Sequence, residues 1–339
     1  FAHYQQSDYL YSRCDSLGLI IWAEIPFVNR VSGQEAENAR NQLRELIRQS
    51  FNHPSIYVWG LHNEVYHPHE YTKELTRSLH DLAKTEDPDR YTVSVNGYGH
   101  MEHPVNLNAD IQGMNRYFGW YKEAGSAEEF GKWLDLYHNE KEKRPVCLSE
   151  YGGGGAISQH KDNVDWKSDI DPVGVRHYEN YQSQLHEILW KQFSVRKYLW
   201  AEFIWCMFDF ASYERVEGDT KSQNDKGLCT RERVPKDAYF FYRSVWSSEK
   251  TVYITERRHE FRACDVPFVK VYSNADAVEL CINDVSYGRI SRCELLDDES
   301  TVFVWENIKI KPDTKNKICA KAYFSDGTSR TDYAFWTGQ

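Results

Sequence analysis

Two short apolar stretches, each ending in a glutamate, constrain the fold of this chain more than any other feature. The first spans residues 55–66 and reads SIYVWGLHNEVY, and the second spans residues 144–155 and reads RPVCLSEYGGGG. Short apolar runs bounded by turn residues are typical of strands that are covered on both faces in a parallel sheet. Because (β/α) barrels place their chemistry at the C-terminal ends of such strands, the pattern predicts that Glu64 and Glu150 lie at one rim.

Two carboxyl groups at one rim are the set that a glycosidase needs. One carboxylic acid protonates the leaving oxygen, while the other carboxylate attacks or stabilises the anomeric carbon. A single glutamate at the end of a strand more often forms a structural salt bridge, so the hypothesis depends on the pair, Glu64 and Glu150.

The first 250 residues alternate between helical and extended patterns, at the pace expected of an α/β fold of the (β/α)8 TIM-barrel type. Helices are predicted at 7–17, 35–50, 68–84, 128–140, 175–192 and 236–246. Strands are predicted at 19–24, 56–61, 91–95, 111–117, 146–148 and 199–207, the last of which is expected to bury Cys206. Because six strands would leave edges in an eight-stranded barrel open, we expect the first two strands to come from upstream residues or from a companion chain.

The pattern of apolar and polar residues changes near residue 251. From there to 339 the segments are short, alternating and rich in Val, Tyr and Phe, with turn residues between them. This pattern predicts an all-β immunoglobulin-like sandwich, an accessory domain at 251–339 that follows a catalytic barrel portion at 1–250. Trp305 and Trp336 could bind sugar there, but packing in the core is the favoured interpretation.

Composition argues against several classes of function. The net charge is −10 and no basic cluster is present, which argues against nucleic acid as a partner. No run of 18 apolar residues is present, which argues against a membrane-spanning helix. The eight cysteines show no CxxC spacing, so neither a zinc site nor a disulfide-built fold is predicted. Aromatic residues make up 15% of the chain, which suits either sugar binding or a Trp-rich core.

Four motifs, in order along the chain, carry a resemblance to glycoside hydrolase family 2, the β-galactosidase and β-glucuronidase family. They are HNE at 62–64, NRYFGWY at 115–121, SEY at 149–151 and WCMFDF at 205–210. The resemblance covers roughly residues 1–246 and implies a retaining double displacement, with Glu150 as the nucleophile and Glu64 as the acid/base. We therefore expect Glu64 to be protonated and Glu150 ionised near neutral pH, because two carboxylates about 5 Å apart push each other's pKa values apart.

The same resemblance implies a set of substrate-binding residues. By resemblance, Tyr117 holds the nucleophile and Asn63 bonds the 2-hydroxyl of the sugar, while Trp205 forms an aromatic wall under it. The remaining predicted contacts are His3 on the floor of the site, Tyr121, and the pair Asn224 and Lys226. In the β-glucuronidases of the family an Asn-x-Lys pair near this point binds the carboxylate of the sugar, and Asn224 and Lys226 fit that spacing.

The predicted substrate is a terminal β-D-galactoside, with a β-glucuronide as the alternative and a non-catalytic carbohydrate-binding role as a further one. A glycosidase of another family with the same barrel, cellulase-like or mannosidase-like, also stays open. No cofactor or metal is predicted, because residues 24–29 (EIPFVN) lack the Glu-x-His pair of the magnesium site found in some β-galactosidases of the family. The chain begins with Phe1 rather than Met, so it is expected to be part of a longer protein with further N-terminal domains. The family resemblance alone suggests a periplasmic or secreted location.

Overall fold

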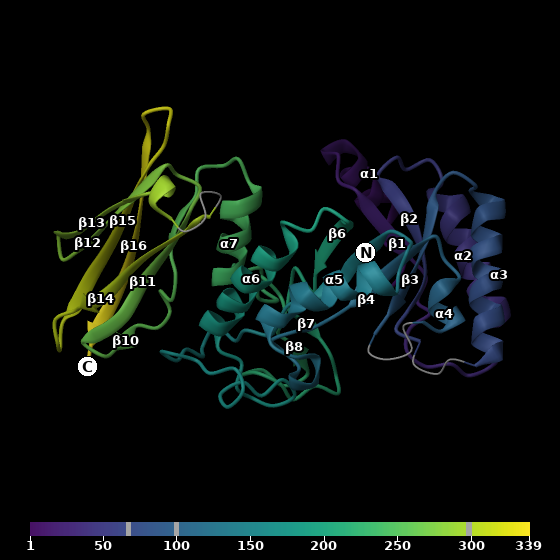
Figure 1. The fold of residues 1–339 in the computed structure, drawn as a ribbon, viewed down its shortest axis with the longest axis horizontal. Coiled ribbons are helices and arrows are strands. Elements are labelled where there is room, and N and C mark those ends of the chain that lie inside the picture. The colour runs from purple at the N-terminus through teal and green to yellow at the C-terminus, as the bar shows by residue number, and fades with distance from the viewer. Residues whose placement is uncertain (66–68, 98–101, 296–299) are drawn as a thin grey trace. The chain divides into compact units, whose positions relative to one another are not determined.

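The computed structural model of the chain describes residues 1–65, 69–97, 102–295 and 300–339 (Figure 1). Contacts divide the chain into two compact units that interleave along the sequence. The first unit comprises Phe1–Phe118, Glu129–Tyr151 and Gln192–Ile204, and the second comprises Gly119–Glu128, Gly152–Lys191 and Trp205–Gln339. The predicted domain boundary between residues 250 and 251 stays a prediction.

The first unit is built on a six-stranded parallel sheet whose strands follow the order of the chain. The strands are β1 (Ile21–Glu24), β2 (Ile56–Asn63), β3 (Tyr91–Asn96), β4 (Ile111–Asn115), β5 (Val146–Tyr151) and β6 (Leu199–Ile204). Parallel neighbours in sequential order, each joined by a crossover, are the arrangement of a TIM barrel. The predicted fold class, a partial barrel followed by a β-sandwich, is therefore confirmed.

Helices cover this sheet in the first unit. They are α1 (Asp8–Leu17), α2 (Ala36–Ser50), α3 (Glu70–Glu86), α4 (Pro104–Leu107) and α5 (Phe130–Glu140). Helix α2 buries Ala39, Leu43, Leu46 and Ile47, whose spacing of three and four residues puts them on one face. Helices α2 and α3 lie side by side in Figure 1.

Two apolar clusters hold the first unit together. One lies on the side of the sheet that α2 and α3 cover and includes Trp59, Leu61, Leu43 and Leu79. The other is made by residues that the strands turn to the opposite side, among them Trp22, Val58, Val93 and Cys147. Burial of one such side chain stabilises the fold by roughly 1.5–3 kcal/mol. Strands covered on both faces must be apolar throughout, which explains the continuous apolar runs in the sequence.

The second unit contains helices α6 (Glu179–Phe193, whose last two residues fall in the first unit) and α7 (Asp237–Trp246), and a small hairpin of β7 (Phe210–Ala211) and β8 (Gln223–Asn224). Strand β6 ends at Ile204, so the predicted strand to residue 207 is too long. Cys206 lies beyond it and is half-buried, which corrects the expectation of a buried strand residue. The physical reason is that Cys206 makes its backbone hydrogen bonds with Lys226 and Leu228 of a later loop rather than with the neighbouring strand of the sheet.

The C-terminal part of the second unit is a sandwich of two sheets. The five-stranded sheet has the order β10 (Phe261–Arg262), β16 (Ser329–Gly338), β15 (Lys315–Tyr323), β12 (Ala277–Ile282) and β13 (Val285–Ser291). The three-stranded sheet has the order β14 (Val302–Lys309), β11 (Asp265–Ser273) and β9 (Val252–Ile254). Trp305 and Trp336 are buried in the core between the sheets, as the favoured interpretation predicted. Among the described helices, none is long and apolar enough to cross a membrane.

Candidate active site

The two predicted catalytic glutamates both lie at the C-terminal ends of strands in the first unit. Glu150 is the second-last residue of β5, and Glu64 directly follows β2. Glu64 adopts a positive φ of 50°, a conformation that is uncommon for a residue with a side chain. Its backbone N–H donates to the carbonyl of Val95 at 3.0 Å, which fixes the turn at the end of the strand.

Asn115, the last residue of β4, links the two glutamate strands. Its side-chain NH2 group donates to Glu64 Oε1 at 2.9 Å and to Asn63 Oδ1 at 3.1 Å. Its side-chain oxygen accepts from the Ser149 hydroxyl at 2.7 Å, and its backbone is the register partner of Glu150. The fully buried Asn115 amide therefore orients the Glu64 carboxylate and the amide of Asn63 together.

The Glu150 carboxylate is buried and is bound by Tyr117. The Tyr117 hydroxyl donates to Glu150 Oε2 at 2.5 Å. Burial and the nearby Glu64 carboxylate raise the pKa of Glu150 to about 8, although Tyr117 and His3 act to lower it. Burial therefore opposes the expected ionisation of Glu150, whereas Tyr117 and His3 favour it. Burial penalises the charged form of Glu150, because a buried carboxylate loses its contacts with water.

His3 lies beside Glu150, and its predicted place on the floor of the site stays a prediction. Its Nε2 lies 3.8 Å from Glu150 Oε1, and its Nδ1 is 2.7 Å from Glu24 Oε1 at the end of β1. Although burial alone would lower it, the hydrogen bond and the charge of Glu24 raise the pKa of His3. A positively charged His3 would favour the ionised form of Glu150, which a nucleophile requires.

Arg116 is a buried cation that the sequence reasoning missed. Its guanidinium donates to Asn96 Oδ1 at 2.5 Å and to the carbonyl of Gly97 at 2.6 Å, and it lies over the ring of Trp133. These bonds anchor the chain immediately before Tyr117. The signal was present in the sequence, because the NRYFGWY motif begins with Asn115 and Arg116.

The predicted Asn-x-Lys pair lies in the second unit. Asn224 closes the β8 strand, and its side-chain oxygen accepts from the backbone N–H of Lys226 at 3.0 Å. This bond bends the loop so that the Lys226 side chain is 1% exposed. The Lys226 ammonium lies 5.5 Å from the ring centroids of both Trp120 and Tyr121. Tyr121 therefore lies beside Lys226, and its role in binding the substrate stays a prediction.

The ionic neighbours of Lys226 are paired with one another. Asp209 binds the buried Lys236 at 2.8 Å, and Asp225 binds His177 at 2.8 Å. Glu217 binds Arg215 through both carboxylate oxygens, at 2.6 and 2.7 Å, and lies 3.9 Å from Lys226 Nζ. Within the described part of the chain, Lys226 Nζ has no hydrogen-bond partner.

These pairs shift the pKa values of two aspartates in opposite directions. Burial raises the pKa of Asp209 to about 6, against the attraction of Lys236. Burial would also raise the pKa of Asp225, but the hydrogen bond to His177 and the charges of Lys236 and Lys226 hold it below its usual value. A lowered pKa favours the ionised form of the Asp225 carboxyl group, which is also bound to His177.

Glycines let the loop after β5 approach these side chains. Gly152 has a φ of 128°, which residues with a side chain rarely adopt. A Cβ on Gly154 would lie 2.4 Å from Asp225 Oδ1 and 2.7 Å from His177 Nδ1. The glycine run at 152–155 is therefore required by close packing.

Trp205, the predicted aromatic wall, directly follows β6 and belongs to the second unit. Its ring packs edge-on against Phe210 at 5.7 Å between centroids. Its role under the sugar stays a prediction.

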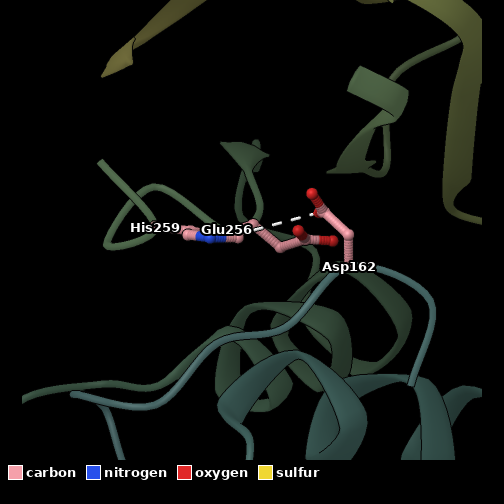
Figure 2. A group of neighbouring side chains, drawn as sticks. All are labelled: Asp162, Glu256 and His259. Carbon is pink, nitrogen blue, oxygen red and sulfur yellow. Dashed lines mark ion pairs between the residues drawn. The ribbon is translucent and has the colours of Figure 1, made fainter. Parts of the chain in front are cut away.

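One group of described residues has the geometry to hold a metal ion. The ligand atoms of Asp162, Glu256 and His259 lie within 4.8 Å of one another. Figure 2 shows these three side chains as neighbours. Arg262 reaches into the same group, with Nη2 at 2.5 Å from Asp162 Oδ1 and at 3.0 Å from Glu256 Oε2. The guanidinium already neutralises these carboxylates, so we assign no metal to this group.

Comparisons with known proteins give the family. A family model described as "Glycosyl hydrolases family 2, TIM barrel domain" matches residues 1–251, and a domain of unknown function matches residues 266–330. A Bacteroides fragilis protein named "Beta-glucuronidase" is 37% identical over 91% of this chain and 44% of its own length. A Formosa agariphila protein named "Putative beta-glucuronidase" is 32% identical over 85% of this chain and 37% of its own length.

A solved structure is also similar to this chain over its whole length. The crystal structure of a "putative beta-galactosidase" from Bacteroides fragilis has a TM-score of 0.91 and 49% identity, covering 100% of this chain and 49% of that one. The chain thus spans about half the length, or less, of the relatives that it matches. The barrel match over residues 1–251, together with these identities, shows that the chain belongs to glycoside hydrolase family 2.

Proposed function

We propose that the protein is a retaining exo-β-glycosidase in which Glu150 is the nucleophile and Glu64 the acid/base. The support is the position of the two carboxyl groups at the C-terminal ends of β2 and β5, each held by a hydrogen bond from β4 or the residues that follow it. Asn115 donates to Glu64, and Tyr117 donates to Glu150. The Glu64 carboxylate also acts on Glu150 electrostatically, since it is one of the groups that raise the pKa of Glu150.

The reaction follows from these roles in two steps. First, Glu64 transfers its proton to the glycosidic oxygen while a Glu150 oxygen forms a bond to the anomeric carbon and the leaving group departs. Second, Glu64 removes a proton from a water molecule, which attacks the anomeric carbon and releases Glu150. Two inversions at one carbon retain the β configuration of the sugar.

Tyr117 and His3 prepare Glu150 for the first step. The nucleophile must be ionised, although burial and Glu64 favour its protonated form. A hydrogen bond and a cation both stabilise the carboxylate relative to the acid. We therefore assign Tyr117 and His3 to holding Glu150 in the reactive state.

For the sugar, the observation that carries the proposal is the buried ammonium of Lys226, which is 3.9 Å from Glu217 but has no hydrogen-bond partner among the described residues. A charged group in a protein interior is costly unless it has a partner. Arg215, Lys236 and His177 are each bound to a carboxylate, and Lys226 Nζ lacks a hydrogen bond among the described residues. A carboxylate on the substrate would supply that bond. We therefore favour a β-glucuronide as the substrate, and the names of the two relatives support this choice.

A β-galactoside is the second candidate, and Glu217 favours it. The Glu217 carboxylate lies 3.9 Å from Lys226 Nζ and already offsets part of its charge. A second carboxylate from the sugar would be repelled by Glu217, whereas a neutral hydroxymethyl group would not. The name of the 49%-identical structure supports this alternative.

The experiment that separates the two is an assay of the complete protein on 4-nitrophenyl β-glucuronide and β-galactoside, with Lys226→Ala and Lys226→Met. Loss of a charge-assisted hydrogen bond is expected to lower kcat/KM on the glucuronide about tenfold to a hundredfold. Activity on the galactoside should change little in Lys226→Met, which keeps the length of the side chain. A wild-type preference for the galactoside that survives both substitutions would reject the glucuronidase proposal.

A further inference from the structure

The five-stranded sheet of the sandwich presents an outer face whose side chains point away from the core. Along β16, Ala334 and Trp336 are buried, and the alternate residues Tyr333 and Phe335 are 48% and 46% exposed. Phe261 of β10, opposite Thr337, is 58% exposed. The solvent face of an antiparallel sheet is normally polar, so a row of exposed rings is unusual there.

Lysines of the adjacent strand lie over these rings. The register places Lys317 opposite Phe335, and Lys315 and Lys321 lie on the same face of β15. Lys315 Nζ lies 4.8 Å from the centroid of Phe335, and Lys317 Nζ lies 5.3 Å from that of Tyr333. Lysines often protect edge strands from pairing with other chains, but β15 lies between β16 and β12 inside the sheet. Protection of an edge therefore does not explain them.

The outer face is cationic on an acidic protein. Lys315, Lys317, Lys321 and Arg289 share the face, with Glu279 as the register partner of Lys321 and Arg289. The chain as a whole carries a net charge of −10. Lys317 pairs with the exposed Asp284 at 3.1 Å, and an exposed pair of this kind contributes little energy and exchanges readily. The lysines can therefore bind an anionic partner.

We propose that the outer face binds an anionic polysaccharide, with sugar rings stacked on Tyr333, Phe335 and Phe261 and with carboxylate or sulfate groups bound by Lys315, Lys317 and Lys321. Exposed rings on a rigid sheet suit the flat C–H faces of sugars, and the lysines between them supply charge complementarity. A protein partner fits less well, because lysine is depleted in the centre of protein interfaces. This proposal concerns the sandwich and does not depend on which sugar the barrel hydrolyses.

Affinity electrophoresis of the complete protein tests this proposal, in native gels that contain polygalacturonate, dextran sulfate or neutral dextran. An acidic protein should be repelled by both polyanions, so retardation in either of them and not in dextran is the expected result. Retardation by polygalacturonate alone would identify carboxylates as the bound groups, and retardation by dextran sulfate alone would identify sulfates. No retardation in either polyanion would overturn the proposal.

Variants locate the binding to the outer face. Tyr333→Ala/Phe335→Ala and Lys315→Gln/Lys317→Gln should each weaken binding about tenfold or more, because each removes two of the side chains that the proposal assigns to the polysaccharide. Lys309→Gln is the matched control, because Lys309 is an exposed lysine of the other sheet. Thermal unfolding checks that each variant is folded. Equal weakening by Lys309→Gln would indicate non-specific attraction, and self-association that Phe335→Ala abolishes would identify a second copy as the partner. Either result would contradict the proposal.

Discussion

The Tyr117 hydroxyl donates a 2.5 Å hydrogen bond to Glu150 Oε2, and this is the contact that most directly opposes the raised pKa of the buried carboxyl group. Tyr117 comes two residues after the end of β4, and Glu150 lies on the neighbouring strand β5. A hydrogen bond to the charged form lowers a pKa, and burial raises it. The state of Glu150 near neutral pH therefore depends on Tyr117.

Replacement of Tyr117 by Phe removes that hydrogen bond and should raise the pKa of Glu150 further. The acid limb of the kcat/KM profile should then move to higher pH, because Glu150 must be ionised to attack. At pH 6 the loss should be about tenfold or more, and it should shrink as the pH rises. A loss that is the same at every pH between 5 and 9 would mean that Tyr117 does not act through the ionisation of Glu150.

Replacement of Glu64 by Gln separates the proton donor from the nucleophile. Substrates with good leaving groups need no protonation and should still form the glycosyl-enzyme, while unactivated glycosides should not react. Removal of a like charge should also lower the pKa of Glu150, so the acid limb should move to lower pH. Azide should restore turnover of the activated substrate by attacking the anomeric carbon. Equal losses on both kinds of substrate, without rescue by azide, would remove Glu64 from the acid/base role.

Replacement of Glu150 by Gln should stabilise the folded protein at neutral pH while abolishing activity. The folded-state pKa of about 8 lies above the usual value of 4.5, so the wild type loses stability as the pH rises from 4.5 to 8. At pH 7 this loss is about 3 kcal/mol, and a neutral Gln avoids it. Thermal unfolding between pH 4 and 8 measures the difference, which should vanish below pH 4.5.

The control for this stability measurement is Glu70→Gln on α3, because the Glu70 side chain is 71% exposed. That substitution should leave the pH dependence of unfolding unchanged. If Glu150→Gln gave the same stability difference at every pH, the ionisation of Glu150 would not be the cause.

Patterns repeated along the chain made the barrel predictable from sequence. Glu64 and Glu150 were found because each closes an apolar run, and parallel strands of this kind carry their side chains to one rim. The helix predicted at 7–17 ends at Leu17 in the structure, where Gly18 adopts the left-handed conformation that closes it. Trp305 and Trp336 were correctly predicted to be in the core. In the structure, both alternate with more exposed residues along their strands.

Contacts between residues far apart in sequence could not be predicted. Asn115 was passed over because the strand was expected to continue to Tyr117, whereas it ends at Asn115 and turns that side chain toward Glu64. The His177–Asp225 pair joins residues 48 positions apart, and no local pattern indicates it. Helix α4 and the β7–β8 hairpin were missed because each is too short to show periodicity.

The raised pKa of Glu150 also could not be predicted from the sequence. The family resemblance implies which residue attacks, but the burial that raises the pKa of Glu150 is set by the tertiary structure. Glu150 is surrounded by Tyr117, His3 and Glu64, which come from three separate segments of the chain.

The central claim is that Glu150 forms the covalent intermediate, and trapping that intermediate tests it most directly. The complete protein is incubated with 2-deoxy-2-fluoro-β-glucuronyl fluoride and, separately, with its galactosyl counterpart, then digested and analysed by mass spectrometry. The 2-fluoro group slows hydrolysis of the intermediate, so the label should accumulate on the peptide that contains Glu150. Fragmentation should place the label on the Glu150 side chain, and Glu150→Gln should not be labelled. A label on Glu64 or on another carboxylate, or a first-formed product of α configuration, would contradict the account.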